Sequence, residues 1–382
     1  MKKLICSVAF LFLVTISHAQ STTADIIKQS KDRVRLLKSI SYNVKSTDKN
    51  PFAEGNVTVA ARTTTVVFNP AGTITYKNVQ TNVDGKRVLG ETYVDGKLYF
   101  VNLVDSTYTE EVPKAPVICE IIEIVSILED ELMQRSSKII RQLDTVFEGK
   151  KCYKFMIKSF DTIANGNHDY IHKKILIDQK TMLPVYLKST GAGDGNKEGL
   201  SLGRLNVYNE KILYCVALNR KNSITPFVTT GLTLPNTAML KDGEMAPELY
   251  LKSLSGLDVS KDNFKDKFLL VVFGETTCPA NPLANPMLNR LHAKFASEEF
   301  LIVNVYTNEM SEQVKKYIKS NAIKFPVYLG NRKLTKAFKT IGTPNFYLIN
   351  NEGKVARAYN GYSDSLEEEL TENIAKLQAK TQ

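Results

Sequence analysis

The feature that constrains this chain most is an apolar run, Phe268–Phe273, which is rich in β-branched and aromatic residues and stops at Gly274. Its length and composition are typical of a buried strand. Cys278 follows four residues later, and helical spacing begins at Pro279, a residue that fits the first turn of a helix. The pattern predicts a cysteine between a buried strand and a helix N-terminus, where the helix dipole and free N–H groups favour the reactive thiolate.

The segment Thr277-Cys278-Pro279-Ala280-Asn281 resembles the active-site turn of thioredoxin-fold proteins, and most of all that of the TlpA-like thiol-disulfide oxidoreductases, which carry W-C-x-x-C there. The first cysteine is kept as Cys278, whereas Thr277 replaces the tryptophan and Asn281 replaces the second cysteine. A dithiol cycle needs a second thiol to resolve the mixed disulfide, and Asn281 cannot do so. The resemblance implies a degenerate C-x-x-N site with Cys278 as candidate nucleophile and with Thr277, Pro279 and Asn281 beside the substrate.

Other parts of the C-terminal region extend this resemblance. The segment 243–249 is similar to the G-x-x-A-P entry of TlpA-like and peroxiredoxin-like chains, and Pro286 lies at the offset from Cys278 that TlpA-like chains show. Thr343-Pro344 matches the cis-proline loop of the family. That loop faces the active cysteine and offers a backbone edge to peptides, so the resemblance implies that Thr343 and Pro344 bind substrate.

Besides the missing tryptophan and second cysteine, two further departures weigh against ordinary thioredoxin catalysis. Val272 stands where thioredoxin has a buried acid, and Ala284 stands where TlpA-like chains often have a glutamate. Peroxiredoxins need Thr or Ser three residues before their cysteine, and this chain has Glu275, which argues against peroxidase activity. If Glu275 lies close to Cys278 in space, its charge opposes the helix dipole, and the sequence leaves the net sign open.

The first residues predict export. Lys2 and Lys3 precede an apolar stretch, Leu4–Ile16, and Ser17-His18-Ala19 is a small-x-small cleavage pattern. We expect residues 1–19 to be a signal peptide cleaved after Ala19, and the mature protein to reside in the periplasm or cell envelope. The apolar stretch is too short to span a membrane, no longer one follows, and no cysteine at the cleavage point predicts a lipid anchor.

The charge balance narrows the partners. The chain has 50 Lys and Arg against 40 Asp and Glu, and loss of Lys2 and Lys3 leaves 48 against 40, a net charge of +8. This excess of positive charge has two interpretations. It belongs to solvated lysine-rich faces, or it attracts the protein to an anionic envelope surface or substrate. Nucleic acid is not an expected partner of an exported chain without a compact basic cluster.

Cysteine and histidine spacing predicts no metal site and no cofactor. The mature cysteines match no zinc pattern; they are Cys119, Cys152, Cys215 and Cys278. His168 and His172 are four residues apart, but Asn165-Gly166 upstream predicts a hairpin turn, which places them near a strand start instead of on a helix. Cys152 and Cys215 both lie in predicted strands and could form a disulfide, although the sequence does not show whether they are adjacent.

The N-terminal half predicts a helix followed by antiparallel strands. Residues 23–38 have helical apolar spacing, and residues 39–109 alternate, with hairpin turns at Asp84-Gly85 and Asp95-Gly96. A helix is expected over 117–143, with Cys119 as a buried core thiol. Further strands are expected at 152–157, 173–177, 183–187, 205–209 and 212–217.

This order of elements over residues 23–218 resembles the open half-barrel of LolA-like and LppX-like lipoprotein carriers. Phrases such as Tyr93-Val94-Asp95-Gly96-Lys97-Leu98-Tyr99 support the likeness. The resemblance implies an α+β domain with an apolar concavity for acyl chains, and hence a lipid or lipoprotein partner. The alternative is a sheet-and-helix domain with an ordinary filled core.

The sequence thus predicts two domains, at 20–218 and 242–382, joined by a polar linker at 219–241 that contains Pro226, Gly231 and Pro235. Strands and helices alternate after residue 242, which predicts an α/β thioredoxin-like domain with a central mixed sheet covered by helices on both faces. A terminal helix is expected after Ser365.

Three functions remain compatible with these patterns. The first is monothiol exchange or thiol capture through Cys278, with the second thiol supplied from outside or from the N-terminal half. The second is a non-catalytic thioredoxin-like binding module coupled to a carrier-like domain that holds a peptide, lipid or protein. The third is a largely structural envelope protein.

Overall fold

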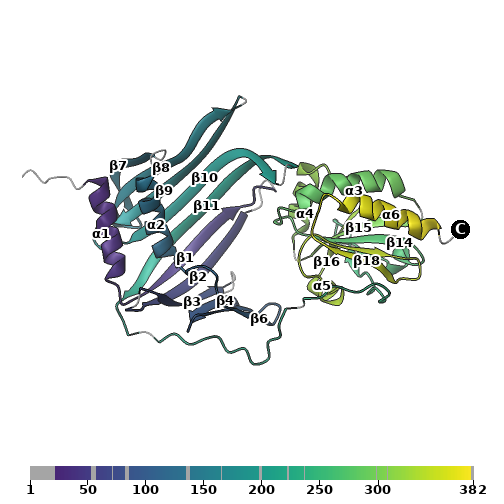
Figure 1. Ribbon diagram of the computed structural model, residues 1–382, viewed down its shortest axis with the longest axis horizontal. Coiled ribbons are helices and arrows are strands. Elements are labelled where there is room, and N and C mark those ends of the chain that lie inside the picture. The colour runs from purple at the N-terminus through teal and green to yellow at the C-terminus, as the bar shows by residue number, and fades with distance from the viewer. Residues whose placement is uncertain are drawn as a thin grey trace, which may run out of the picture.

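The computed structural model of the protein describes residues 22–379, except 53–56, 71, 82–85, 135–137, 165, 198, 199, 222, 236, 298 and 308. The expected signal peptide, residues 1–19, and the Asp84-Gly85 turn lie outside the described residues. The described chain is built on two separate β-sheets, a large one followed by a smaller one (Figure 1).

The larger sheet has eleven strands in the order β6-β5-β4-β3-β2-β1-β11-β10-β9-β8-β7, all of them antiparallel to their neighbours. The predicted meander of β1 to β6 is confirmed, and the sheet is open because β6 and β7 are its two ends. The strands are β1 Ser39–Lys49, β2 Val57–Phe68, β3 Ile74–Thr81, β4 Arg87–Val94, β5 Lys97–Asn102, β6 Thr107–Glu111, β7 Lys138–Phe147, β8 Lys150–Ala164, β9 Asn167–Asp178, β10 Pro184–Lys197 and β11 Leu200–Leu218.

Two helices, α1 (Thr23–Arg35) and α2 (Glu120–Met133), pack on one end of this sheet (Figure 1). A capping box between Thr22 and Asp25 starts α1. The helices and the sheet share one core, which includes Ile26, Ile124, Leu128, Tyr42 and Phe155. A pocket of about 230 Å³ remains beside the two helices and the β2–β3 turn. The lipid partner stays a prediction, because the core between helices and sheet is filled with side chains.

Two predictions for this half are wrong in detail. The helix expected over 117–143 ends at Met133, and Ile139 and Ile140 pair with β8 instead. Pairing with a neighbouring strand outweighs local helical spacing, particularly for β-branched residues. The two strands expected at 205–209 and 212–217 are one strand, β11, because the polar residues between them continue the ladder with β10.

Two local predictions are confirmed. Asp95 and Gly96 have φ values of 52° and 76° and connect β4 to β5 in a two-residue hairpin, where Val94 faces Lys97. Cys119 is buried, and it precedes the first residue of α2 as the N-cap.

The smaller sheet has seven strands in the order β13-β12-β16-β15-β14-β17-β18. Its strands are β12 Leu251–Lys252, β13 Asp258–Val259, β14 Phe268–Gly274, β15 Phe300–Thr307, β16 Val327–Gly330, β17 Asn345–Ile349 and β18 Val355–Asn360. The helices are α3 Asn281–Phe295, α4 Ser311–Ser320, α5 Arg332–Ala337 and α6 Leu366–Ala379, and a 3₁₀ turn spans Lys261–Phe264. β14, β15 and β16 are parallel and the other pairs are antiparallel, which confirms the predicted mixed sheet.

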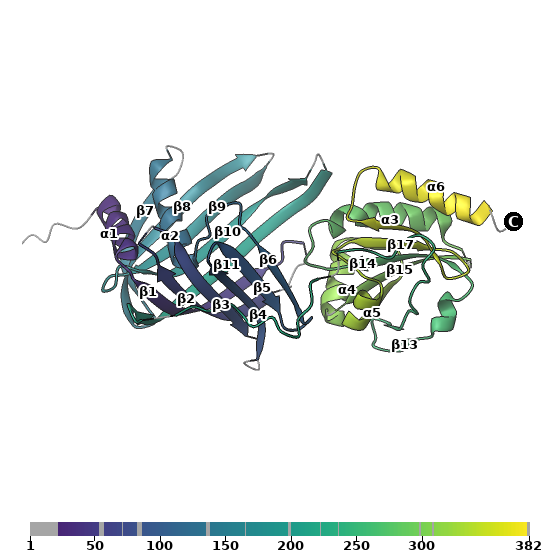
Figure 2. The same ribbon diagram turned by 60° about the horizontal axis from the view of Figure 1, so that its bottom comes forward.

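The central strand β14 is buried on both faces. Leu270 and Val272 pack in a cluster with residues of α3 and α6, whereas Val271 and Phe273 pack on the other side with Phe338, which follows α5. Figure 2 shows α3 and α6 on one side of this sheet and α5 on the other. Coverage on both faces explains why the apolar run is continuous and does not alternate.

The two sheets meet near one end of β14. Asn50, just after β1, donates from Nδ2 to the carbonyl oxygen of Thr276 at 2.6 Å. Arg332 of α5 forms an ion pair of 2.6 Å with Asp105, which lies between β5 and β6. Thr276 belongs to the turn that holds Cys278, and Arg332 belongs to α5 of the same domain. The N-terminal sheet therefore borders the candidate site.

Candidate functional site

The turn after β14 presents Cys278. The Cys278 N–H donates to the carbonyl oxygen of Glu275 at 3.2 Å, and the Asn281 N–H donates to the carbonyl oxygen of Cys278 at 3.2 Å. The helix begins at Asn281, with Pro282 in its first turn, so the expectation that Pro279 occupies the first helical turn is wrong. The proline that lacks an N–H in the first turn is Pro282, and Cys278 precedes the helix by three residues.

The thiol faces the loop before β17. Its Sγ lies 3.0 Å from the carbonyl oxygen of Thr343, to which the thiol donates. The Thr343–Pro344 peptide bond is cis, as the family resemblance implied. Cys278 is half-buried, whereas Thr277 and Pro279 on either side of it are exposed. The sulfur therefore lies at the surface between two loops, where a partner molecule can reach it.

Asn281, at the position of the missing second cysteine, points away from solvent. It is 3% exposed, and its Nδ2 donates to the carbonyl oxygen of Glu275. A Cβ at Gly274 would lie 3.2 Å from this Nδ2 and 3.3 Å from the ring of Tyr306, which explains why the strand ends in glycine. Asn281 holds the turn closed against the end of β14.

Polar groups lie beneath the turn. Glu309, after β15, accepts hydrogen bonds of 2.8 Å at Oε1 from both the N–H and the hydroxyl of Thr276. Its Oε2 is buried without a hydrogen-bond partner among the described residues. Burial raises the pKa of Glu309, the two bonds from Thr276 oppose that rise, and the charge of Glu275 adds to it. Burial likewise raises the pKa of Tyr317, and the nearby Cys278 contributes.

The other three described cysteines are free and lie far from Cys278. Cys119 and Cys152 are buried and Cys215 is exposed. Cys215 faces Tyr42 of β1, eight residues before Asn50, so about 26 Å of extended strand separates it from the contact with Thr276. The possible Cys152–Cys215 disulfide is absent, since β9 and β10 lie between their strands.

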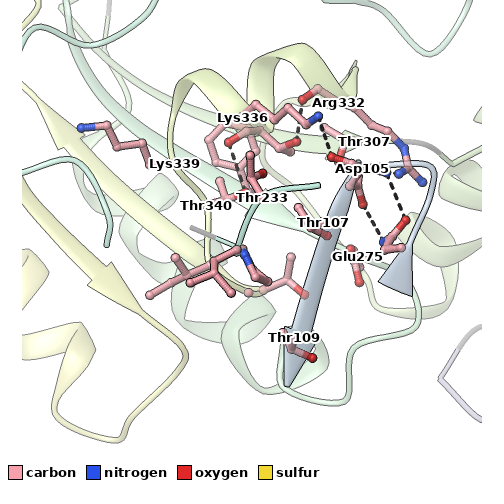
Figure 3. Close-up of a pocket in the computed structure, with 18 of the residues that line it drawn as sticks. Asp105, Thr107, Thr109, Thr233, Glu275, Thr307, Arg332, Lys336, Lys339 and Thr340 are labelled. Atoms are coloured by element: carbon pink, nitrogen blue, oxygen red, sulfur yellow. Dashed lines mark hydrogen bonds and ion pairs between the residues drawn. The ribbon is translucent and has the colours of Figure 1, made fainter. Parts of the chain in front are cut away.

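A cleft of about 690 Å³ opens between the two sheets beside this turn (Figure 3). One wall is lined by Thr343, which contacts the Cys278 thiol, and by Glu275, which precedes Cys278 in the turn. Residues of β5 and β6 line the other wall. Arg332 and Lys336 contact the side chain and the carbonyl oxygen of Asp105, at 2.6 and 3.2 Å. Glu275 is exposed on its outer side, but partial desolvation by the neighbouring chain raises the pKa of its carboxyl group, and the charge of Arg332 opposes the rise. The cleft reaches the atoms that hold the Cys278 thiol.

Sequence reasoning missed several of these residues. The carboxyl ends of the parallel strands β14 and β15 meet at one sheet edge, so an acid just after β15 was a signal for Glu309. No pattern announced Asn50, Asp105 or Arg332, because their contacts join segments more than two hundred residues apart. Among the described residues, no group of three His, Cys, Asp or Glu side chains could hold a metal ion. His168 and His172 lie in β9, and both contact Asp161.

Comparison with known proteins matches the C-terminal part of the chain. The model of the AhpC/TSA family matches residues 243–358. A thiol-disulfide oxidoreductase, ResA, of Bacillus thuringiensis is 27% identical over 136 residues, which are 35% of this chain and 78% of that protein. The thioredoxin-like protein YneN of Bacillus subtilis is 25% identical over 118 residues, 30% of this chain and 69% of that protein.

The C-terminal part of the chain is thus similar to thioredoxin-like thiol-disulfide oxidoreductases. Among solved structures, a putative DsbE thiol:disulfide interchange protein from Chlorobium tepidum is 22% identical, with a TM-score of 0.34 and coverage of 36% of this chain and 98% of that one. The family model begins at residue 243, so the resemblance of the N-terminal sheet to lipoprotein carriers stays a prediction. No helix in the described part of the chain has the length and apolar character needed to cross a membrane.

Proposed function

We propose that the thioredoxin-like domain exchanges thiols and disulfides through Cys278 alone, and that a thiol from another molecule resolves the mixed disulfide. The observation that carries this proposal is the placement of two side chains. The Cys278 sulfur lies at an accessible turn, 3.0 Å from the Thr343 carbonyl oxygen, while Asn281 is buried in the place of a second thiol. The similarity to thiol-disulfide oxidoreductases supports the type of chemistry.

The proposed step conserves atoms and electrons. The Cys278 thiol loses its proton to solvent, and the thiolate attacks one sulfur of a substrate disulfide, forming a new S–S bond. The substrate bond breaks, and its second sulfur leaves as a thiolate that takes up a proton. A thiol from a further molecule then attacks the mixed disulfide and releases Cys278 in its original state. One substrate sulfur has then become a free thiol, and the other is joined in a new disulfide to the thiol that attacked last, so the net reaction is an exchange of disulfides.

The N-terminal cysteines do not suit the resolving role. Cys215 lies about 26 Å of strand away from the contact with the active turn, and Cys119 lies in the core of the helix-covered end. Of the two sources that the sequence left open, an external thiol is therefore favoured. The mixed disulfide should persist until such a thiol arrives.

The substrate we propose is a protein or peptide disulfide. Exposed Thr277 and Pro279 on one side of the sulfur, and the Thr343-Pro344 loop on the other, are the proposed contacts for its backbone. Asn281 contributes by fixing the turn. We further propose export through residues 1–19, and two domains at 20–218 and 242–382 joined by the linker 219–241.

Glutathione disulfide tests this function. The purified mature protein is incubated with it, and the intact mass and the modified residue are read by mass spectrometry. We expect one glutathione per chain on Cys278, stable until dithiothreitol is added, no such adduct in Cys278→Ser, and an unchanged adduct in the control Cys215→Ser. An unmodified Cys278, or an adduct that disappears without added thiol, would contradict the proposal.

A second candidate is a binding module without redox chemistry. The observation that favours it is the cleft of about 690 Å³, which is within the range of ligand-binding pockets. In that case Cys278→Ser should bind a peptide as well as the wild type does, and no adduct should form on Cys278. The glutathione experiment therefore separates the two candidates.

A further inference from the structure

One wall of the cleft is the free edge of the N-terminal sheet. Strand β6 is the last strand of that sheet and pairs with β5 on one side only. At its outer edge, Thr233 forms an isolated parallel bridge: the Tyr108 N–H donates to the Thr233 carbonyl oxygen, and the Thr233 N–H donates to the Ser106 carbonyl oxygen, both at 3.0 Å. The chain itself thus shows that this edge accepts an extended segment.

The bridge ends after one residue, and the edge beyond it is left open. A parallel ladder would next require an N–H from Pro235, which proline lacks. The linker then crosses to the other domain, where Leu240 joins the core on one face of the smaller sheet. N–H directions alternate along a strand, so the Glu110 N–H points outward like that of Tyr108, and no described backbone group accepts it.

The chemistry of the lining indicates what can lie along this edge. Seven lining residues are threonines, whose hydroxyl groups both donate and accept; they are Thr107, Thr109, Thr233, Thr307, Thr335, Thr340 and Thr343. The three lining cations already have partners, since Arg332 and Lys336 contact Asp105 and Lys339 pairs with Glu244 at 3.3 Å. The lining also contains apolar side chains, among them Phe100 and Ile341, and this mixture of hydroxyl groups and apolar surface with compensated charge suits an extended peptide better than a polyanion.

We propose that β6 is the docking strand for substrate: an extended, cysteine-bearing segment of a partner protein adds to its outer edge beyond Tyr108 and presents its sulfur to Cys278 across the cleft. This inference rests on the proposed exchange at Cys278. The N-terminal sheet then holds the substrate while the smaller sheet holds the nucleophile. Figure 3 shows Thr107 and Thr109 along β6, with Glu275 on one side of the strand and Thr340 on the other in this view; all four residues line the cleft. Strand addition of this kind uses main-chain hydrogen bonds, so it tolerates many substrate sequences.

The first test removes one outward N–H from the edge. Glu110→Pro deletes the outward donor and leaves the inward bonds to β5, which proline on an edge strand permits; Glu110→Ala loses the same side chain and keeps the donor. For each variant, the rate of reaction is measured with a short cysteine peptide linked to thionitrobenzoate and, separately, with cysteine linked to thionitrobenzoate. We expect Glu110→Pro to slow the peptide about fivefold, the equivalent of one hydrogen bond, and to leave the small reagent unchanged. Equal peptide rates in the two variants would overturn the docking strand.

A second measurement does not depend on redox chemistry or on the proline variant folding. Cys278→Ser is saturated with the same peptide carrying serine for cysteine, and amide hydrogen exchange is followed along the chain. We expect slower exchange in β6, at Tyr108–Glu111, together with the loop at Thr343. Protection at the loop without protection in β6 would overturn the inference and leave the proposed function standing. A wild-type protein inert to the small reagent would instead refute the proposed function.

Discussion

The two sheets of this molecule differ in how their strands are buried. Every residue of β14 is buried, between one core on the side of α3 and α6 and another on the side of α5. Helices cover the N-terminal sheet at one end only, so apolar side chains such as Val207 and Phe160 are exposed farther along its strands, and its edge at β6 is bridged only at Thr233 in the described chain. A sheet covered on both faces fixes the turn that bears Cys278, whereas an open sheet offers surface and edge. In the arrangement that we propose, the reactive sulfur belongs to one sheet and the docking edge to the other.

The largest change is expected from restoring a second thiol to the covered sheet. Asn281→Cys places a cysteine one tight turn after Cys278, within the Cα distance that a disulfide allows. We expect the persistent glutathione adduct to give way almost completely to an internal disulfide, visible as a mass loss of two hydrogens in the intact chain. Persistence of the adduct in this variant would show that the turn cannot bring two sulfurs together.

A core substitution should separate the two sheets by stability. Leu270→Ala in β14, where the side chain is fully buried, is expected to lower the free energy of unfolding of the C-terminal domain by about 2–5 kcal/mol. Val207→Ala in β11, at a residue 51% exposed, should change the free energy of unfolding of the N-terminal domain by less than about 0.5 kcal/mol. Urea unfolding followed by hydrogen exchange assigns each transition to its domain. Equal losses in both variants would contradict the difference in burial.

A smaller and pH-dependent effect is expected at Glu309. Its raised pKa means that the folded state holds the proton more tightly than the unfolded state, so this group's contribution to stability falls as the pH rises above the usual glutamate range. Glu309→Gln keeps an acceptor for Thr276 and removes the charge. It should therefore be more stable than wild type at neutral pH, by roughly 1 kcal/mol, and show no gain in acid. A gain independent of pH would exclude this cause.

The smallest effect is expected where the sheets meet. The Arg332–Asp105 pair is partly exposed, so a double-mutant cycle of Arg332→Ala and Asp105→Ala should give a coupling energy below about 1 kcal/mol. The rate at which a protease cleaves the linker is measured for the same variants. Because the pair joins the two domains, the linker of each variant should be cut faster than that of the wild type. A coupling of several kcal/mol would indicate a rigid joint between the two sheets.

The sequence predicted the covered sheet better than the open one, and burial explains the difference. The continuous apolar run and helical spacings placed β14, β15, α4 and β17 close to their observed bounds. In the N-terminal half, the strand character of residues 138–143 depends on pairing with β8, which no local pattern contains.

The candidate site was predictable only in its local parts. Cys278 and the Thr343-Pro344 loop followed from a motif, and the structure brings them within hydrogen-bond distance. The contacts of Asn50 with Thr276 and of Arg332 with Asp105 join residues far apart in sequence and involve ordinary polar side chains. The edge of β6 is a backbone feature, so it has no side-chain signal at all.

The central claim is that one accessible sulfur, with no partner thiol in its own chain, performs the exchange. The most direct test is alkylation of the native, unreduced protein with iodoacetamide, followed by mapping of all four mature cysteines by mass spectrometry. We predict rapid modification of Cys278, slower modification of Cys215, whose pKa is raised by partial desolvation beside the sheet, and no modification of buried Cys119 and Cys152 until denaturant is added. A Cys278 that resists the reagent in the folded protein, or that is found bonded to another cysteine of the same chain, would contradict it.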